Sequence, residues 1–223
     1  GCAPAAQWSV NAQDGLTALG DRFPADFICE AIDQTRGWFY SLLALNTMVF
    51  GQTPYRNVVC LGHLVDDEGR KMSKSLGNVI DPNDLFPTHG ADGVRWYMFS
   101  LGAPWGSKRI SVNAMVQRVR KDLHTLWNTA QFYRQYAELE RSIPDLAEPS
   151  DHVMDRWIRS RLNHLAAQVT EHLSGFVAHQ AAAEISNFID ELSNWYIRRN
   201  RRRFWDGANG ADFRALATLR EVL

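Results

Sequence analysis

Residues 57–75 have the sequence NVVCLGHLVDDEGRKMSKS, an apolar run followed by a loop that carries two lysines and two serines. The run at 58–61 is continuously apolar, as expected for a strand of a parallel sheet that is covered on both faces. The ammonium and hydroxyl groups of residues 70–75, here called the lysine loop, can hold a polyphosphate while it leaves, because lysine is a compact charge on a flexible stem. This stretch therefore predicts an α/β fold with a phosphate-binding loop at the end of a buried strand.

The hundred residues around this stretch alternate between strand and helix patterns. We expect a strand over 26–30 and a helix over 33–50 that ends at Gly51. The apolar spacing predicts a helix face formed by Trp38, Leu42, Leu45 and Val49. Strand, helix and strand make a right-handed crossover, the unit of a nucleotide-binding sheet. The end of the first strand, with Glu30, is then expected at the same sheet edge as the lysine loop.

Beyond residue 80 the pattern becomes helical. Asp81-Pro82 is a typical helix start, with aspartate as N-cap and proline in the first position. Residues 102–106 are rich in turn formers. Helices are expected over 92–98, 112–130, 158–173 and 185–195, with a linker at 141–150. The last two helices are expected to be antiparallel, in a bundle that begins near residue 150.

Composition agrees with a globular protein of one or two domains, since 45% of the 223 residues are hydrophobic. The net charge of −1 predicts no general attraction to nucleic acid, so that an RNA contact needs a local basic patch. Cys2, Cys29 and Cys60 form no Cys-x-x-Cys pair, which argues against a disulfide framework or a zinc site. No stretch is apolar enough to cross a membrane and no signal peptide is visible, so we expect a cytoplasmic protein without membrane contact.

Three stretches resemble one enzyme family. Lys71-Met72-Ser73-Lys74-Ser75 is similar to the second signature of class I aminoacyl-tRNA synthetases. Residues 27–39, with the string Gln-Thr-Arg-Gly-Trp-Phe, resemble the amino-acid-binding segment of the isoleucyl-tRNA synthetases. Residues 191–199 resemble the opening of the anticodon-binding helices in the same family.

This resemblance implies a fold that is first α/β and then all-α. Residues 1–102 are expected to form the C-terminal half of a Rossmann-like nucleotide-binding domain, 103–148 a helical stem-contact or linker region, and 149–223 the first part of a helical anticodon-binding domain. The family's other signature, His-x-Gly-His, and its editing domain are not found in the sequence. The chain also begins without Met, and residues 1–7 resemble a stretch inside the catalytic domain. We therefore expect a fragment of a longer enzyme that is inactive by itself.

The resemblance assigns the lysine loop to ATP. In the family, the carboxylate of isoleucine attacks the α-phosphate of ATP and expels pyrophosphate, a transfer that depends on positioning and on neutralising charge on the leaving oxygens. Lys74 is expected to make the main catalytic contact with the departing phosphates, and Lys71 to assist it. Ser73 and Ser75 are expected to donate hydrogen bonds to phosphate or to fix the loop. The alternative interpretation is a solvated basic turn.

Other ATP contacts follow from the same resemblance. Gly62, His63 and Leu64 are expected beside the adenine, through backbone contacts. His63 is not expected to be a general base, because the attacking carboxylate is already ionised. No pair of residues shows convincing metal-ligand spacing, and Mg²⁺ is expected to arrive with ATP as part of the substrate.

Four residues are expected to bind the isoleucyl-adenylate. Glu30 is expected to contact its α-amino or other polar groups, and Asp33 and Gln34 its ribose hydroxyls or amino group, because carboxylates accept short charge-assisted hydrogen bonds. Trp38 is expected in the wall of the isoleucine pocket. As alternatives, Asp33 is only a helix N-cap, Glu30 a surface acid and Trp38 a core residue. Ala31 stands where many family members have glycine, which puts the local backbone geometry in question.

A basic cluster near the C-terminus is the candidate RNA contact. Five of the six residues over 198–203 are arginines, and tryptophan and tyrosine side chains bracket them. Arginine forks match phosphate oxygens, and aromatic rings stack on unpaired bases. We expect Arg198, Arg199 and Arg202 to contact a tRNA. The alternative is a helix end whose arginines pair with acidic groups of the bundle or interact with the helix dipole.

The expected function is therefore the ATP-dependent attachment of isoleucine to tRNA(Ile) through an isoleucyl-adenylate. One alternative keeps the enzyme class and changes the amino acid to valine or leucine. The string that follows Asp33 argues against it. The other alternative is a catalytically inert, tRNA-binding fragment.

Overall fold

The computed structural model of the chain describes residues 20–139, 150–205 and 212–223. The chain forms two compact units, one made of residues 1–79 and 103–110 and the other of residues 80–102 and 111–223. Residues 1–7 and most of the expected linker lie outside the described ranges. No helix in those ranges combines the length and the apolar character that a membrane span requires.

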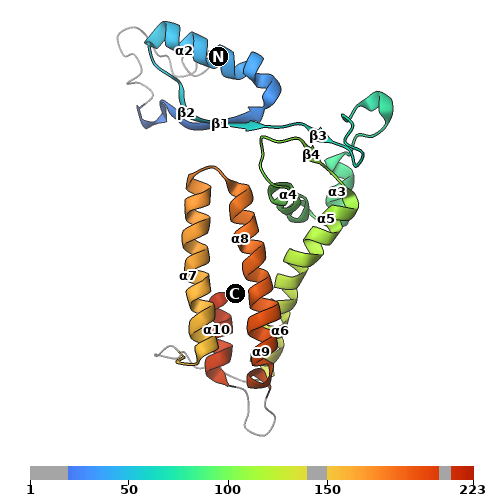
Figure 1. Cartoon of the computed structure of the whole chain (residues 1–223), viewed down its shortest axis with the longest axis vertical. Coiled ribbons are helices and arrows are strands. Elements are labelled where there is room, and N and C mark those ends of the chain that lie inside the picture. Colours follow the sequence, from blue (N-terminus) through green and yellow to red (C-terminus); the bar gives the residue numbers. More distant parts are fainter. Residues whose placement is uncertain (1–19, 140–149, 206–211) are drawn as a thin grey trace. The chain divides into compact units, whose positions relative to one another are not determined.

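The first unit begins as an α/β structure. Strand β1 (Ala25–Ala31) is followed by the 3₁₀-helix η2 (Ile32–Arg36), helix α2 (Trp38–Phe50) and strand β2 (Tyr55–Leu61). The two strands pair in parallel along their whole length, and α2 connects them beside the sheet (Figure 1). The expected strand–helix–strand unit is present.

Helix α2 begins later than the sequence indicated. The expected start at Asp33 is wrong, because residues 32–36 form η2 and the α-helix begins at Trp38, after Gly37. The side-chain Oε1 of Gln34 accepts a hydrogen bond from the backbone N–H of Trp38 at 2.9 Å. Gln34 therefore satisfies one of the unpaired donors that every α-helix has at its start.

The buried face of α2 also differs from the expected one. Phe39, Leu42 and Asn46 are buried, whereas Val49 is 67% exposed. The helix is apolar around most of its circumference, so that periodicity could not choose between two neighbouring stripes. Phe39 and Leu42 pack with Ile28 of β1 and form a small core.

Strand β2 is less covered than predicted. Val58 is 43% exposed and Leu61 37%, and Phe27 of β1 is 50% exposed. The prediction that β2 is buried on both faces is therefore wrong for the described residues, in which α2 is the helix that packs on this two-stranded sheet.

A second small sheet follows directly on β2. Strand β3 (Leu64–Val65) pairs in parallel with β4 (Lys108–Arg109), a strand that the sequence did not predict. The lysine loop, the 3₁₀-helix η3 (Lys74–Leu76) and two helices come between these strands in the chain. Residues 103–110 thus return to the first unit after the chain has entered the second.

The second unit is helical. It begins with α3 (Pro82–His89), α4 (Ala91–Ser100) and α5 (Val112–Val119), and continues through the π-helix η4 (Arg120–His124) into α6 (Thr125–Leu139). The predicted N-cap is confirmed, because the side chain of Asp81 accepts a hydrogen bond from the backbone N–H of Asn83 at 2.8 Å. The helix expected over 112–130 is present, but it contains the π-helix and runs on to Leu139.

A buried carboxylate lies in the π-helix. Asp122 is 1% exposed and accepts hydrogen bonds from Trp96 Nε1 at 2.8 Å and from Ser186 Oγ at 2.7 Å. These bonds join η4 to α4 and to a helix of the bundle. The spacing of apolar residues gave no sign of this polar contact.

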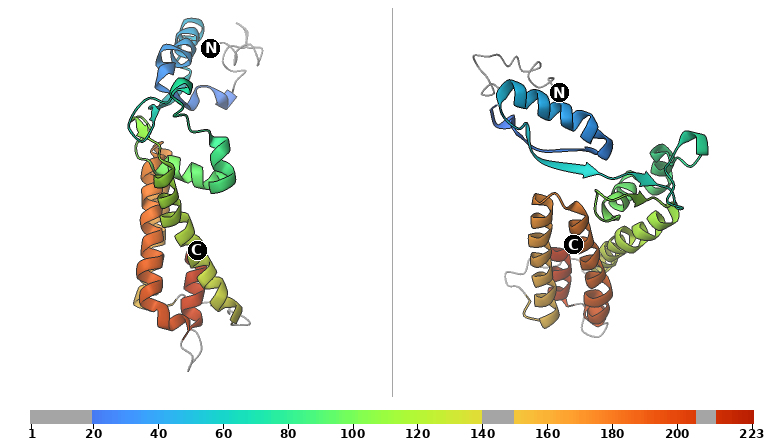
Figure 2. Two further views of the ribbon diagram at one scale, coloured as in Figure 1. Left: turned by 90° about the vertical axis from the view of Figure 1, so that its right-hand side faces the viewer. Right: turned by 45° about the horizontal axis from the view of Figure 1, so that its top comes forward.

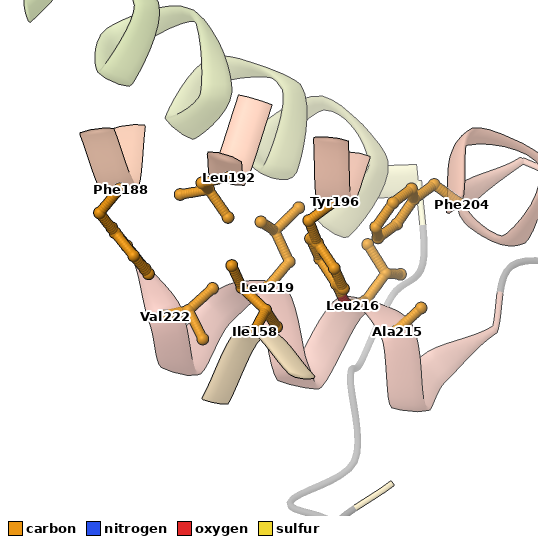
Figure 3. Close-up of a cluster of buried hydrophobic side chains, with 9 residues drawn as sticks. All are labelled: Ile158, Phe188, Leu192, Tyr196, Phe204, Ala215, Leu216, Leu219 and Val222. Carbon is orange, nitrogen blue, oxygen red and sulfur yellow. The ribbon is translucent and has the colours of Figure 1, made fainter. Parts of the chain in front are cut away.

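The bundle begins with α7 (Val153–Ser174) and α8 (Ala178–Asp190), which form the predicted antiparallel pair (Figures 1 and 2). The π-helix η5 (Glu191–Ile197), α9 (Arg198–Asn200), the 3₁₀-helix η6 (Arg201–Phe204) and α10 (Phe213–Val222) follow. Figure 3 shows the shared core, which consists of Ile158, Phe188, Leu192, Tyr196, Phe204, Ala215, Leu216, Leu219 and Val222. The all-α second part is confirmed.

Candidate functional site

The residues predicted to bind the adenylate, and two of those expected beside the adenine, lie at or just after the ends of β1 and β2. Glu30 lies opposite Cys60 at the end of the parallel pair, and its side chain is exposed. Asp33, also exposed, lies in η2, directly after β1. Gly62 and His63 follow β2 directly. Because open α/β sheets bind ligands at the carboxyl ends of their strands, both acids are available at the expected edge.

Gln34 is engaged with its neighbours in the chain. Its Nε2 donates a hydrogen bond to Asp33 Oδ2 at 3.0 Å, and its Oε1 accepts the bond from the N–H of Trp38. The alternative that made Asp33 the N-cap of the following helix is wrong, because Gly37 occupies that position. Gln34 orients the carboxylate of Asp33, and binding of the adenylate by either side chain stays a prediction.

Trp38 is not a core residue. Its side chain is 40% exposed, while the adjacent Phe39 takes the buried position and lies 6.0 Å away between ring centroids. The alternative that explained Trp38 by burial in α2 is therefore wrong. A half-exposed indole at the first residue of α2, beside η2, is suited to line a pocket for an apolar side chain.

The backbone at Gly62 crosses another segment at very short range. A Cβ atom on Gly62 would lie 2.2 Å from the carbonyl oxygen of Gly106, closer than real Cβ atoms approach any atom. The N–H of Gly62 donates to the carbonyl of Pro104 at 2.8 Å, and the N–H of Lys108 donates to the carbonyl of His63 at 2.9 Å. These bonds hold residues 103–110, here called the return segment, against the end of β2. The N–H of Gly62 is therefore already paired within the protein.

Asp66 anchors the start of the lysine loop. It is 6% exposed, and its carboxylate accepts hydrogen bonds from the backbone N–H of Arg70 at 2.7 Å, from Arg70 Nε at 2.9 Å and from Asn78 Nδ2 at 2.8 Å. Lys71, which follows Arg70 in the chain, forms an antiparallel β-bridge with Val65 of β3. The first residues of the loop are therefore tied to a strand.

Asn78 closes the loop from its other end. Its Oδ1 accepts a hydrogen bond from the backbone N–H of Ser73 at 2.8 Å, and its Nδ2 also donates to the carbonyl of Lys71 at 3.3 Å. Together with its bond to Asp66, these contacts form what we call the Asp66–Asn78 clasp. Neither residue was predicted from the sequence. The available signal was an Asp-x-x-Gly turn just before the loop, in which Gly69 has a φ of +81°.

Inside the clasp, part of the lysine loop faces solvent. Lys71 and Ser75 are exposed, and Lys74 begins η3. Ser73 Oγ lies 3.1 Å from Ser75 Oγ and accepts a hydrogen bond from the N–H of Leu76 at 3.3 Å. Ser73 thus fixes the loop, which is one of the two roles expected of the serines.

The clasp also sets the charge of Asp66. The hydrogen bond from Asn78 is the largest cause that lowers the pKa of this carboxyl to about 2, and the bonds and charge of Arg70 add to it against the opposing effect of burial. Asp66 is therefore ionised at every physiological pH and holds its partners as a carboxylate.

Replacing Asn78 by alanine is expected to slow adenylate formation by about 10- to 100-fold, because a loop that loses its closing contacts no longer places its lysines. ATP–pyrophosphate exchange in a complete synthetase that carries this chain measures the effect. Asn83→Ala is the matched control, since Asn83 is exposed at the start of α3 and contacts Asp81. Equal rates in the two variants would contradict the role of the clasp.

The clasp predicts an acid-sensitive loop. The pKa of Asp66 in the folded chain, about 2, lies below the ordinary value of 3.8, so its contribution to stability is present above about pH 4 and is lost as the pH falls toward 2. Carboxyl NMR titration should give this low pKa, and hydrogen exchange over 66–78 should quicken in the same pH range. In Asn78→Ala the pKa of Asp66 should rise. A wild-type Asp66 that titrates at its ordinary value would show that the clasp does not form.

The basic cluster on the second unit divides into two kinds of arginine. Arg198, Arg199 and Arg202, the three expected to contact tRNA, are exposed, and the guanidinium of Arg199 lies 4.1 Å from the ring centroid of Trp195. Arg203 instead turns inward and forms an ion pair with Asp155 at 2.7 Å. The alternative of pairing within the bundle is thus correct for Arg203, whereas no ion pair to a described residue involves the other three.

Comparison with known proteins identifies the family of the chain. Residues 3–111 match the family model "tRNA synthetases class I (I, L, M and V)", and residues 155–223 match "Anticodon-binding domain of tRNA ligase". The chain belongs to the class I aminoacyl-tRNA synthetases. The first match covers the strand ends and the lysine loop, and the second covers the bundle and its arginines.

The curated relatives that match the chain include isoleucine–tRNA ligases. The isoleucine–tRNA ligase of Streptomyces avermitilis is 47% identical over 226 residues, and that of Deinococcus radiodurans is 45% identical over 233 residues. Each match covers 100% of this chain and 21% of the relative. This class I chain therefore spans about a fifth of the length of those relatives.

Solved structures support the class I fold. A Mycobacterium tuberculosis methionyl-tRNA synthetase in complex with methionyl-adenylate matches 93% of this chain and 43% of its own, with a TM-score of 0.76 and 24% identity. A leucyl enzyme from Agrobacterium radiobacter, in a ternary complex described as LeuRS-tRNA-LeuAMS, matches 89% of this chain and 24% of its own, with a TM-score of 0.63 and 22% identity. At such identities the likeness concerns the fold alone.

Metal ligands are not evident in the part of this synthetase chain that the structure describes. Within those ranges, no group of three or more His, Cys, Asp or Glu side chains is arranged to hold an ion.

Proposed function

We propose that this chain is part of an isoleucine–tRNA ligase. The observation that carries the proposal is the 45–47% identity to such ligases in matches that cover the entire chain. The exposed carboxylates of Glu30 and Asp33 and the lysine loop held by the clasp support the proposal, because they leave polar groups available for ATP and an aminoacyl-adenylate.

In the proposed first step, a carboxylate oxygen of isoleucine attacks the α-phosphorus of ATP. A new P–O bond forms, the bond to the β-phosphate oxygen breaks, and pyrophosphate leaves with its Mg²⁺. Lys74 and Lys71 stabilise the charge that develops on the leaving group, which is a large contribution to such transfers. Gly62, His63 and Leu64 border the adenine, and Ser73 and Ser75 complete the loop.

The isoleucyl-adenylate is held by the β1 edge. Glu30 pairs with the α-amino group of isoleucine, Asp33 and Gln34 bind the ribose or the amino group, and Trp38 lines the apolar pocket. A ribose hydroxyl of the tRNA then attacks the carbonyl carbon of the adenylate, so that an ester forms and AMP leaves. The substrates are therefore isoleucine, ATP with Mg²⁺ and tRNA(Ile), and we place the enzyme in the cytoplasm.

The second unit is proposed to bind tRNA. Its match to an anticodon-binding domain, together with the exposed Arg198, Arg199 and Arg202, supports contacts with the tRNA backbone. Guanidinium groups that have no acidic partner among the described residues can pair with phosphate oxygens.

ATP–pyrophosphate exchange with isoleucine, valine and leucine tests the proposal, in a complete synthetase that carries this chain. We expect isoleucine to give the highest kcat/KM. The advantage over valine should be only about 10- to 200-fold, because the two side chains differ by one methylene. A preference for valine or leucine would assign another member of the class, and no exchange with any of the three would favour an inert RNA-binding protein.

A further inference from the structure

Among the described residues of the bundle, Asp155 is the most completely enclosed carboxylate. It lies in the first turn of α7 and is 0% exposed. Tyr196 donates a hydrogen bond to its Oδ1 at 2.8 Å, and Ser150 donates one to its Oδ2 at 2.6 Å. Arg203 completes the set with a two-pronged contact, Nη1 to Oδ1 at 2.8 Å and Nη2 to Oδ2 at 2.7 Å.

Arg203 belongs to the basic cluster but faces the opposite way from the rest. Its side chain is 17% exposed, and its Nε also donates to Asp212 Oδ2 at 2.9 Å. Asp212 in turn is the N-cap of α10. The Nη1 of Arg203 also donates a hydrogen bond to Asn200 Oδ1, at 3.1 Å. One guanidinium therefore joins α7, η6 and the start of α10.

The charged state of this buried pair is maintained by its contacts. Burial alone would raise the pKa of Asp155, but the hydrogen bonds from Arg203, Ser150 and Tyr196 outweigh it, and the pKa lies below its ordinary value. Burial would likewise lower the pKa of Arg203, but its bonds to Asp155 and Asp212 hold the pKa above the ordinary one. Stability is a weak explanation for such a pair, because well-packed apolar residues can replace buried ion pairs without loss.

The inward direction of Arg203 fixes the direction of its neighbours. Residues Arg201–Phe204 form a single 3₁₀ turn with about three residues per turn, so that one inward side chain obliges the two before it to point elsewhere. Arg201 and Arg202 are exposed, and the guanidinium of Arg201 lies 4.8 Å from the ring centroid of Trp205. Phe204, at the end of the turn, is fully buried in the core.

We propose that Asp155 is a positioning residue for RNA binding, because its two-pronged hold on Arg203 keeps the η6 turn in the one rotation that presents Arg201 and Arg202 to a tRNA backbone. Asp155 touches no RNA itself. The inference rests on the proposed tRNA binding by the exposed arginines and adds the residue that orients them.

The test compares Asp155→Asn and Arg203→Lys with the wild type in a complete synthetase that carries this chain. Lysine keeps the charge at 203 but cannot make the two-pronged contact. We expect the KM for tRNA to rise about tenfold in either variant, as the loss of one or two phosphate contacts implies. The kcat of aminoacylation and the rate of ATP–pyrophosphate exchange should stay close to the wild-type values.

The salt dependence of tRNA binding separates positioning from simple damage. Each lost phosphate contact should make the plot of log affinity against log salt shallower by nearly one unit. Partial unfolding would instead lower the fraction of protein that binds, with an unchanged slope and dissociation constant. Glu221→Gln is the matched control, since it removes the Arg159–Glu221 pair, also between α7 and α10, and leaves Arg203 untouched.

The possible outcomes are distinct. If Asp155→Asn fails to fold, Arg203→Lys decides the matter, because it retains a cation beside both carboxylates. A folded variant with wild-type KM and salt slope would overturn the proposal. A wild-type enzyme that binds no tRNA would instead overturn the proposed function on which the inference rests.

Discussion

Replacing Lys74 by alanine is expected to slow isoleucine-dependent ATP–pyrophosphate exchange by about 10²- to 10³-fold, the usual effect of removing one group that stabilises transition-state charge. Lys74 begins η3, within a loop that the Asp66–Asn78 clasp holds at both ends. In the proposed function, Lys74 contacts the leaving pyrophosphate and not the amino acid. Isoleucine binding, measured by calorimetry, should therefore change little.

The control for this prediction is Lys121→Ala. Lys121 is an exposed lysine on the second unit, within η4, so its removal changes the net charge equally and leaves the loop intact. Exchange by this variant should equal that of the wild type. Near-normal exchange by Lys74→Ala would refute the catalytic role of the loop, whereas an equal loss in both variants would point to a general effect of charge.

Replacing Gly62 by alanine is expected to destabilise the first unit by about 3 kcal/mol or more, beyond the usual cost of overpacking. The added Cβ would lie 2.2 Å from the carbonyl oxygen of Gly106, and this neighbour is backbone that no side-chain rotation can move away. The return segment would have to leave β2, which breaks the bond from Gly62 to Pro104 and the pairing of β3 with β4. Adenylate formation should be lost as well.

Gly106→Ala is the matched control, on the other backbone of the same crossing. Its Cβ would find its nearest neighbour, the carbonyl oxygen of Ala103, at 3.8 Å, which is an ordinary contact. Thermal unfolding and hydrogen exchange over 61–66 and 104–110 measure both variants. Equal stability of Gly62→Ala and Gly106→Ala would mean that the two segments do not cross as described.

Local signals predicted much of the fold. The strand at β2, the Asp81 N-cap and the helical spacing of α7 and α8 each depend on residues close in sequence, and each element is present as expected, although β2 is less buried than predicted. The family resemblance added the order of the two parts. Within the candidate site, Glu30 was placed correctly at the end of β1, because open parallel sheets bind ligands at the carboxyl ends of their strands. The lysine loop, expected directly after the buried strand β2, instead follows the short strand β3 of a separate sheet.

Contacts between distant residues could not be predicted in the same way. The pairing of β3 with β4 joins two-residue strands that carry no periodicity of their own. Asp122 and Asp155 are buried because specific donors surround them, and the apolar pattern contains no information about those donors. The sequence also could not show that Phe39, and not Trp38, is the buried residue of α2. Both side chains are apolar, so only the residues that pack against the helix determine which one is buried.

The pairing of β3 with β4 has a consequence for the order in which the protein is made. The ribosome synthesises the chain from its N-terminal side, so a strand that pairs with a later strand cannot form its pairing until that later strand has been synthesised. The two lysines of the loop are translated early, yet strand β4, which pairs with β3 beside the loop, is translated only after α3 and α4 are complete. A message truncated between the codons for residues 79 and 107 would thus yield both lysines without the β3–β4 pairing next to their loop.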